Sequence, residues 1–213
     1  MKTDDLVGML ARGEPAVKPV APGRRFALAL GWGAAGATLV MGVLLGVRTD
    51  LAAALSLPMF WVKLAFVAAL VLASASCVLR LSRPGISLGS APLALAAPVA
   101  AMGLLSALVL MQAESAARAP LIFGQTWQTC PFNIALLSLP TFAVGFRAMK
   151  GLAPTRPSLA GAAVGLFAGT VGALVYVLHC PELAAPFLAT WYVIGMTIPA
   201  LAGALIGPRL LRW

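Results

Sequence analysis

The chain has very little charge. Only 10% of its 213 residues are Asp, Glu, Lys or Arg, whereas a soluble domain usually carries about 25%. So few charges cannot cover a water-facing globule, which excludes a soluble enzyme and a disordered protein. The presence of only three cysteines excludes a disulfide-dense secreted fold, and the lack of a Gly-X-Y period excludes collagen. Since 61% of the residues are hydrophobic, we expect an integral membrane protein.

Six segments are long and apolar enough to cross the hydrocarbon layer, which takes about 20 residues in a helix. They are residues 26–47, 57–79, 91–112, 131–147, 158–178 and 187–207. No connection between them is long enough to hold another folded domain. The sequence therefore predicts an all-α membrane protein with two parts, a tail of residues 1–25 and a six-helix transmembrane bundle of residues 26–213.

The basic residues are distributed unevenly between the two sides of this bundle. Twelve of the 15 Lys and Arg residues fall in the N-terminal tail, the second-to-third connection, the fourth-to-fifth connection and the C-terminal end. Only Arg48 and Arg118 fall on the opposite side. Because Lys and Arg accumulate in cytoplasmic loops, both termini are predicted to be cytoplasmic. The net charge of +9 then reports topology, and we expect no direct binding to nucleic acid.

Gly161, Gly165 and Gly169 are spaced four residues apart and therefore share one face of the fifth predicted span. Small residues with this spacing let two membrane helices approach closely. The spacing suits either packing within the bundle or an interface between two copies of the chain. Packing within the bundle is the commoner use and is favoured here, while the oligomeric state stays open.

Lys63 is the only full charge well inside a predicted span. A charge at this depth is costly and marks a candidate functional residue. Lys63 also lies about two turns from the outer end, from which a long side chain can extend to water. We favour this snorkelling interpretation slightly over a role in a site on the outer face.

Two Cys-Pro sequences fall on the predicted outer side. Cys130-Pro131 lies at the mouth of the fourth span, and His179-Cys180-Pro181-Glu182 follows the fifth. A structural disulfide between Cys130 and Cys180 would suit an oxidising compartment. A soft-metal site would use the two thiolates, with His179 and Glu182 as further ligands. A redox switch would change the packing when the thiols are modified. All three alternatives stay open at this point.

The remaining cysteine pattern limits the chemistry further. The chain contains no Cys-x-x-Cys sequence, so an envelope thiol oxidoreductase has little support. Cys77 falls near the predicted inner end of its span, where we expect it to be inert packing.

The tail of residues 1–25 is the longest polar stretch. Thr3 can cap a short helix that ends at Gly13, with acidic residues in its first turn and apolar residues on one face. Prolines between residues 15 and 22 would form an extended tether. Such a segment suits binding to a cytoplasmic partner. A disordered start or a segment lying on the lipid are the alternatives, and composition alone favours them.

These features together resemble the NrsF-type family of six-span bacterial anti-sigma factors. The resemblance is carried by Met1-Lys2-Thr3-Asp4-Asp5-Leu6, Trp127-x-x-Cys130-Pro131, Ser138-Leu139-Pro140, Ala153-Pro154-Thr155-Arg156-Pro157, the glycine-spaced fifth span, His179-Cys180-Pro181-Glu182, Trp191-Tyr192 and Leu211-Arg212-Trp213. It runs over nearly the whole chain.

The resemblance implies a non-enzymatic regulator in the bacterial inner membrane. Members of the family hold an extracytoplasmic-function sigma factor inactive and release it on envelope stress, such as heavy-metal or redox stress. Carried onto this chain, Cys130 and Cys180 become the sensing pair, with His179 and Glu182 beside them. The tail residues that would contact the sigma factor are Asp4, Asp5, Leu6, Met9 and Leu10.

No resident cofactor is expected under this interpretation. A thiophilic metal ion could bind transiently at Cys130 and Cys180 as the signal. The alternative function is a small metal or solute transporter of the inner membrane.

Overall fold

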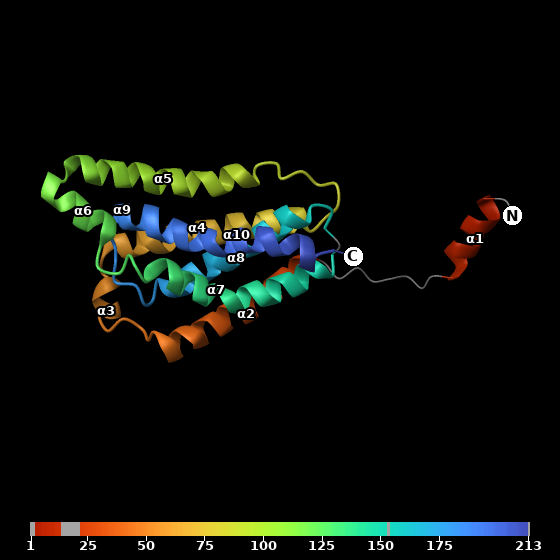
Figure 1. Cartoon of the computed structure of the whole chain (residues 1–213), viewed down its shortest axis with the longest axis horizontal. Helices are drawn as coiled ribbons and strands as arrows, with labels where there is room; N and C mark the ends of the chain where they lie inside the picture. The colour runs from red at the N-terminus through yellow and green to blue at the C-terminus, as the bar shows by residue number, and fades with distance from the viewer. Residues whose placement is uncertain (1–2, 14–21, 153, 213) are drawn as a thin grey trace.

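A computed structural model of the chain describes residues 3–13, 22–152 and 154–212, and all regular secondary structure in that part is helical (Figure 1). Six helical runs are long and apolar enough to cross a membrane. They are α2 (Pro22–Leu44), α4 (Pro58–Leu81), α5 (Ala91–Gln112), α7 (Cys130–Lys150), α8 (Pro157–Tyr176) and the run formed by α9 (Ala185–Phe187), the π-helical turn η1 (Leu188–Tyr192) and α10 (Val193–Leu210). The predicted all-α fold with six candidate spans is confirmed.

Three shorter helices accompany these six. They are α1 (Thr3–Gly13) in the tail, α3 (Leu51–Ala54) after α2, and α6 (Ser115–Phe123) after α5. Helix α1 ends at Gly13, as predicted, and begins at Thr3, which the sequence placed at the cap. Its apolar residues Leu6, Val7, Met9 and Leu10 are all exposed. The tether expected over residues 14–21 lies outside the described residues.

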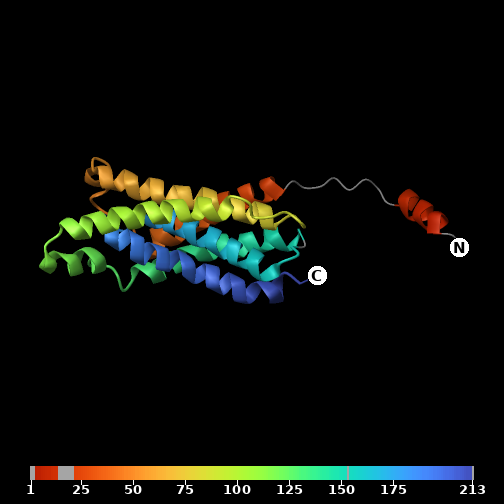
Figure 2. The same ribbon diagram turned by 90° about the horizontal axis from the view of Figure 1, so that it is seen from above.

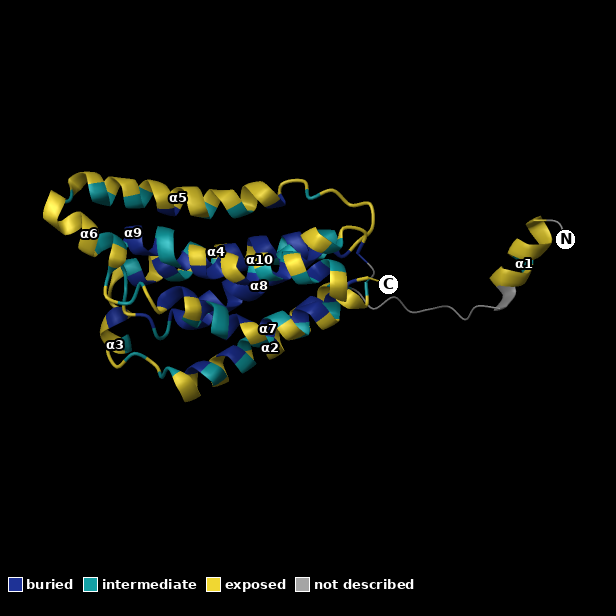
Figure 3. Ribbon diagram, viewed as in Figure 1, coloured by how far each residue is buried: buried dark blue, intermediate teal, exposed yellow. Residues whose placement is uncertain are grey.

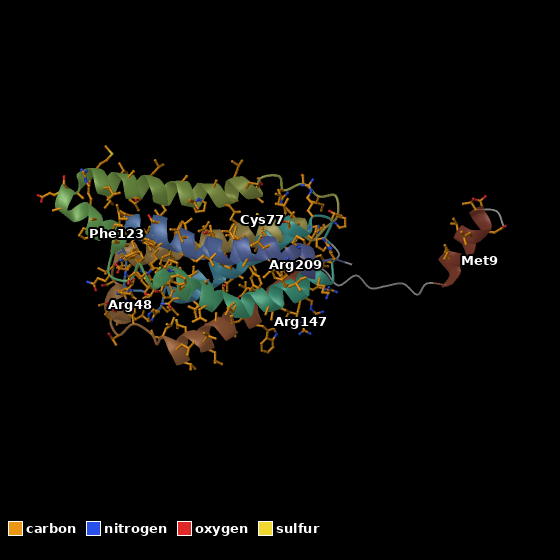
Figure 4. The ribbon with its side chains drawn as sticks, in the orientation of Figure 1. Met9, Arg48, Cys77, Phe123, Arg147 and Arg209 are labelled. Atoms are coloured by element: carbon orange, nitrogen blue, oxygen red, sulfur yellow. The ribbon has the colours of Figure 1, made fainter. Side chains whose placement is uncertain are left out.

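The long helices run alternately up and down, so alternate connections lie at the same end of the bundle (Figure 2). The two ends carry different residues. One end carries the last turn of α7 with Arg147 and Lys150 and the last turn of α10 with Arg209; we call it the basic end. The other carries Cys130 and Cys180, and we call it the cysteine end. Figure 4 labels Arg147 and Arg209 at one end and Arg48 and Phe123 at the other.

Helix α8 is the centre of the bundle, and α5 is its most peripheral member (Figure 3). Most of α8 is buried, because α10, α7 and α4 all pack against it. Helix α5 buries only Ala91 and Met102 and contacts mainly α4 and α9. The helices α4, α5, α7 and α8 each have a proline in their first two positions, where the missing N–H has no intrahelical acceptor to lose.

The glycine spacing of α8 serves packing within the bundle, as favoured from the sequence. A Cβ atom added at Gly161 would meet the carbonyl oxygen of Gly203, and one at Gly165 would meet that of Pro199. At Gly169 the carbonyl oxygen of Met196 would lie 2.6 Å away. The missing side chains thus let the backbones of α8 and α10 touch. This contact positions the connection after α8, which carries Cys180.

We predict that Gly165→Ala lowers the free energy of unfolding by about 1–3 kcal/mol, the usual cost of overpacking, because its new Cβ would press on backbone atoms of α10. Gly42→Ala on α2 is the matched control, since no atom lies within 4 Å of its added Cβ. That control should be neutral or stabilising by up to about 1 kcal/mol. Equilibrium unfolding in mixed detergent micelles, followed by circular dichroism, would measure both. Equal stability of the two variants would contradict the packing account.

Candidate functional site at the cysteine end

The structure brings Cys130 and Cys180 together, although they are 50 positions apart in the sequence. Cys130 is the first residue of α7, and Cys180 lies in the connection between α8 and α9. Both are free thiols with no exposed surface. The two side chains belong to one buried cluster, and the thiol of Cys130 lies close enough to that of Cys180 to lower its pKa. The prediction that both cysteines lie at the same end is confirmed. The structure adds that the two thiols are neighbours.

Lys63 completes the centre of this site from the second turn of α4. Its ammonium donates hydrogen bonds to the carbonyl oxygens of Cys180 (3.0 Å) and Glu182 (2.9 Å). It also lies 4.9 Å from the ring centroid of Tyr192. Because Lys63 has no exposed surface, the interpretation that it snorkels to water is wrong. The connection after α8 folds over the ammonium and supplies the acceptors that water would otherwise provide.

The surroundings of Cys180 favour its ionised form. The neighbouring Cys130 thiol and the ammonium of Lys63 lower the pKa of Cys180 to about 5, although burial acts in the opposite direction. An ordinary cysteine has a pKa of about 8.5. The thiolate is the form of cysteine that attacks electrophiles and binds metals. The surroundings of Cys180 therefore favour the thiolate form.

The other two predicted site residues bind backbone groups of neighbouring connections. The Nδ1 atom of His179 is 2.8 Å from the carbonyl oxygen of Gly46, in the connection after α2. One carboxylate oxygen of Glu182 accepts hydrogen bonds from the backbone N–H groups of Gln125 (2.7 Å) and Thr126 (3.2 Å). Among the described residues, no three His, Cys, Asp or Glu side chains converge on a point where a metal could bind. His179 and the possible fourth ligand Glu182 bind backbone groups of neighbouring connections in this structure, and a metal site on Cys130 and Cys180 stays a prediction.

The interaction of Glu182 links the two Cys-Pro sequences. Gln125 and Thr126 precede Cys130 in the chain, so the carboxylate holds the connection that enters α7 against the one that leaves α8. This close approach requires Gly124, whose φ is +56° and whose added Cβ would lie 2.7 Å from the Glu182 carboxylate. A left-handed backbone at that position favours glycine. The contact helps to hold Cys130 and Cys180 close together.

Sequence reasoning missed two groups around the pair. Arg48 donates hydrogen bonds to both carboxylate oxygens of Asp50 (2.7 Å each) and reaches the carbonyl oxygen of Cys180 at 3.4 Å. Tyr192 is fully buried, and its hydroxyl lies near the sulfur of Cys180 without a hydrogen-bond partner in the described part of the chain. The π-helical turn η1 places Tyr192 there. The sequence offered one signal for these groups, which was the presence of Arg48 on the side of the bundle that has few charges.

An aromatic cluster packs beside the thiol pair at the same end. The ring centroids of Trp127 and Trp191 are 5.1 Å apart, and those of Phe123 and Trp127 are 5.4 Å apart. The indole N–H of Trp191 donates to the carbonyl oxygen of Ile122 at 2.9 Å. The cluster ties α6 and the connection before Cys130 to the turn η1 that carries Tyr192.

Comparison with known proteins identifies the family. A family model described as negative regulator of sigma F matches residues 10–213. The chain is 56% identical to a probable anti-sigma-F factor NrsF of Azospira oryzae and 42% identical to the anti-sigma-F factor NrsF of Caulobacter vibrioides, over the full length of each chain. No solved structure matches it. The resemblance noted from the sequence is therefore confirmed, and the chain belongs to the NrsF family of negative regulators of sigma F.

Proposed function

We propose that this chain is an inner-membrane anti-sigma factor that binds a sigma factor of the extracytoplasmic-function class and releases it on metal or redox stress sensed at Cys130 and Cys180. The two curated relatives are named as anti-sigma-F factors, which supports a sigma factor as the partner. The stress signal and the sensing role rest on the site at the cysteine end. The observation that carries them is the buried, neighbouring pair of free thiols.

The charge distribution supports an orientation with the basic end in the cytoplasm. Arg147, Lys150 and Arg209 lie in the last turns of α7 and α10 at that end. Positive residues are retained on the cytoplasmic side of a membrane. Helix α2 begins at Pro22 at the same end, so the tail would also emerge in the cytoplasm.

The tail supplies a surface suited to a protein partner. Helix α1 has acidic residues in its first turn and an exposed apolar face formed by Leu6, Val7, Met9 and Leu10. An amphipathic helix of this kind binds by laying its apolar face into a groove of the partner. We therefore assign the sigma contact to α1, with Asp4 and Asp5 as polar contacts beside the apolar face.

The thiol pair can receive two kinds of signal. A soft metal ion can bind between two thiolates, since such ligands select thiophilic ions. An oxidant can take two electrons from the Cys180 thiolate and the Cys130 thiol while one proton leaves and the sulfur–sulfur bond forms. Either event changes the position of Cys130 at the start of α7 and of Cys180 just after α8. Packed helices then pass the change to the basic end.

The energy needed for release is modest. Each tenfold loss of sigma affinity requires a difference of about 1.4 kcal/mol between the two states of the bundle. Formation of two metal–sulfur bonds or one disulfide exceeds this by a wide margin. A transport role has less support, because Lys63, on which it would depend, is enclosed by loop carbonyl groups.

We predict that Leu10→Glu weakens binding of the full chain, in lipid nanodiscs, to its sigma factor by about 30-fold or more. Burying a leucine side chain contributes about 1.5–3 kcal/mol, and a buried unpaired carboxylate would add to the loss. Gly8→Glu is the matched control, because 100° of rotation per residue places Gly8 opposite the centre of the apolar face of α1, and it should bind within threefold of the wild type. Surface plasmon resonance would measure both. Equal affinities would contradict the assignment of the contact to the apolar face of α1.

We predict that Cys130→Ser and Cys180→Ser each abolish induction of the regulon by cadmium or by the thiol oxidant diamide. A serine cannot form the metal–sulfur or sulfur–sulfur bond on which the response depends. Each variant should still repress the regulon in unstressed cells, which would show that it is folded and in the membrane. Cys77→Ser is the matched control and should respond like the wild type, since Cys77 lies on α4 away from the pair. Normal induction of a Cys130→Ser or Cys180→Ser strain in a transcription reporter assay would contradict the sensing role.

A further inference from the structure

Lys63 is the one charged side chain of α4 that reaches the thiol site, and it lies in the second turn of that helix. The two acceptors of its ammonium, the carbonyl oxygens of Cys180 and Glu182, belong to the connection that carries the reactive sulfur. The face of Tyr192 covers a third side of the ammonium. A charge kept this deep in a membrane protein is costly, and an apolar residue would fill the same space at no such cost. Packing alone therefore does not account for a lysine at this position.

The carbonyl group of Cys180 is the point where these interactions meet. It accepts from Lys63 at 3.0 Å and from Arg48 at 3.4 Å. Arg48 is fixed in turn by its two hydrogen bonds to Asp50 and by its own backbone N–H, which donates to the carbonyl oxygen of Leu178 at 3.1 Å. The carbonyl group and the thiol belong to the same residue, so they are linked through its backbone. A displacement of the sulfur large enough to move the backbone must therefore change the distance to Lys63.

Helix α4 provides a route from this point to the basic end. It runs from Pro58 to Leu81 and packs against α8. The hydroxyl groups of Ser74 and Thr170, both buried, are 3.0 Å apart at this contact. Cys77 lies one turn further along α4, close to its basic end and nearly buried. A shift of α4 that begins at Lys63 would change the surroundings of Cys77.

We propose that Lys63 is the positioning residue that couples the thiol pair to α4. Capture of Cys130 and Cys180 moves the Cys180 carbonyl, the ammonium loses an acceptor, and α4 shifts along α8. This inference rests on the proposed sensing function and deepens it, because it assigns transmission to α4 in addition to the helices that carry the cysteines.

The test uses the full-length chain in lipid nanodiscs and phenylarsine oxide, which binds two neighbouring thiols. Two arsenic–sulfur bonds form, the arsenic–oxygen bond breaks, and that oxygen leaves as water with the Cys130 thiol proton and one proton from the solvent. Intact-mass spectrometry measures capture at the pair. The rate of Cys77 alkylation by N-ethylmaleimide, followed by peptide mass spectrometry, reports movement of α4. In the wild type, we expect capture to change this rate at least fivefold.

The variants separate coupling from folding. Lys63→Met keeps the length of the side chain and removes the donors, so it should capture arsenic with unchanged stoichiometry while the Cys77 rate no longer responds. Lys63→Arg keeps the charge and the donors and should retain most of the response. Arg118→Met is the matched control for loss of a positive charge at the cysteine end, since Arg118 is exposed and its Nε atom donates only to the carbonyl oxygen of Ala113; it should behave like the wild type.

Two results would overturn the proposal. One is a Lys63→Met variant whose Cys77 rate responds to capture as the wild type does. The other is a wild-type chain in which the rate of Cys77 alkylation does not change on arsenic capture. This result does not depend on the folding of any variant. Sigma affinity measured on the same wild-type sample separates this failure from that of the proposed function. If affinity falls while Cys77 is unaffected, the thiol sensor stands without Lys63 coupling; if affinity is unchanged after capture, the sensing function itself is wrong.

Discussion

The backbone contact between α8 and α10 is the constraint on which the remaining architecture depends. Lipid tails are as apolar as the helices, so little hydrophobic force holds one span against another, and close approach of small residues must do so. Gly161 and Gly165 of α8 lie directly against carbonyl groups of α10. Gly203 and Gly207 of α10 lie in the same way against carbonyl groups of α8. With α8 fixed in the centre, α4 and α7 pack on its remaining surface. The start of α7 and the end of α8 then lie side by side, which brings Cys130 to Cys180.

The cysteine end shows how polar chemistry is accommodated within this apolar frame. The ammonium of Lys63, the carboxylate of Glu182 and the imidazole of His179 all bind backbone groups of the connections between helices. Each of these bonds joins segments that are distant in sequence. The connections around the buried thiols are therefore held together by polar side chains. A reagent that changes the sulfurs acts on the same connections that those side chains hold.

The spans were predictable from the sequence because each depends on local composition, and the observed helix ends lie within a few residues of the predicted ones. The same reasoning placed both cysteines at one end, since alternate connections share a side. It could not show that the thiols are neighbours, because their distance depends on how α7 packs against α8, where a Cβ added at Gly172 would lie 2.8 Å from the carbonyl oxygen of Ile134. Nor could it assign Lys63, His179 and Glu182, whose partners are backbone groups far away in the chain. A residue type indicates which chemistry is available, whereas the tertiary fold decides which atom it meets.

The account requires that a change at one end of the bundle alters binding at the other. The most direct measurement is the dissociation constant of the sigma factor from the full-length chain in nanodiscs, before and after phenylarsine oxide occupies the cysteine pair. The account predicts an affinity at least tenfold weaker after capture, equivalent to about 1.4 kcal/mol, and no change for Cys180→Ser treated in the same way. An unchanged dissociation constant for the wild type, with both thiols demonstrably bound to arsenic, would contradict it.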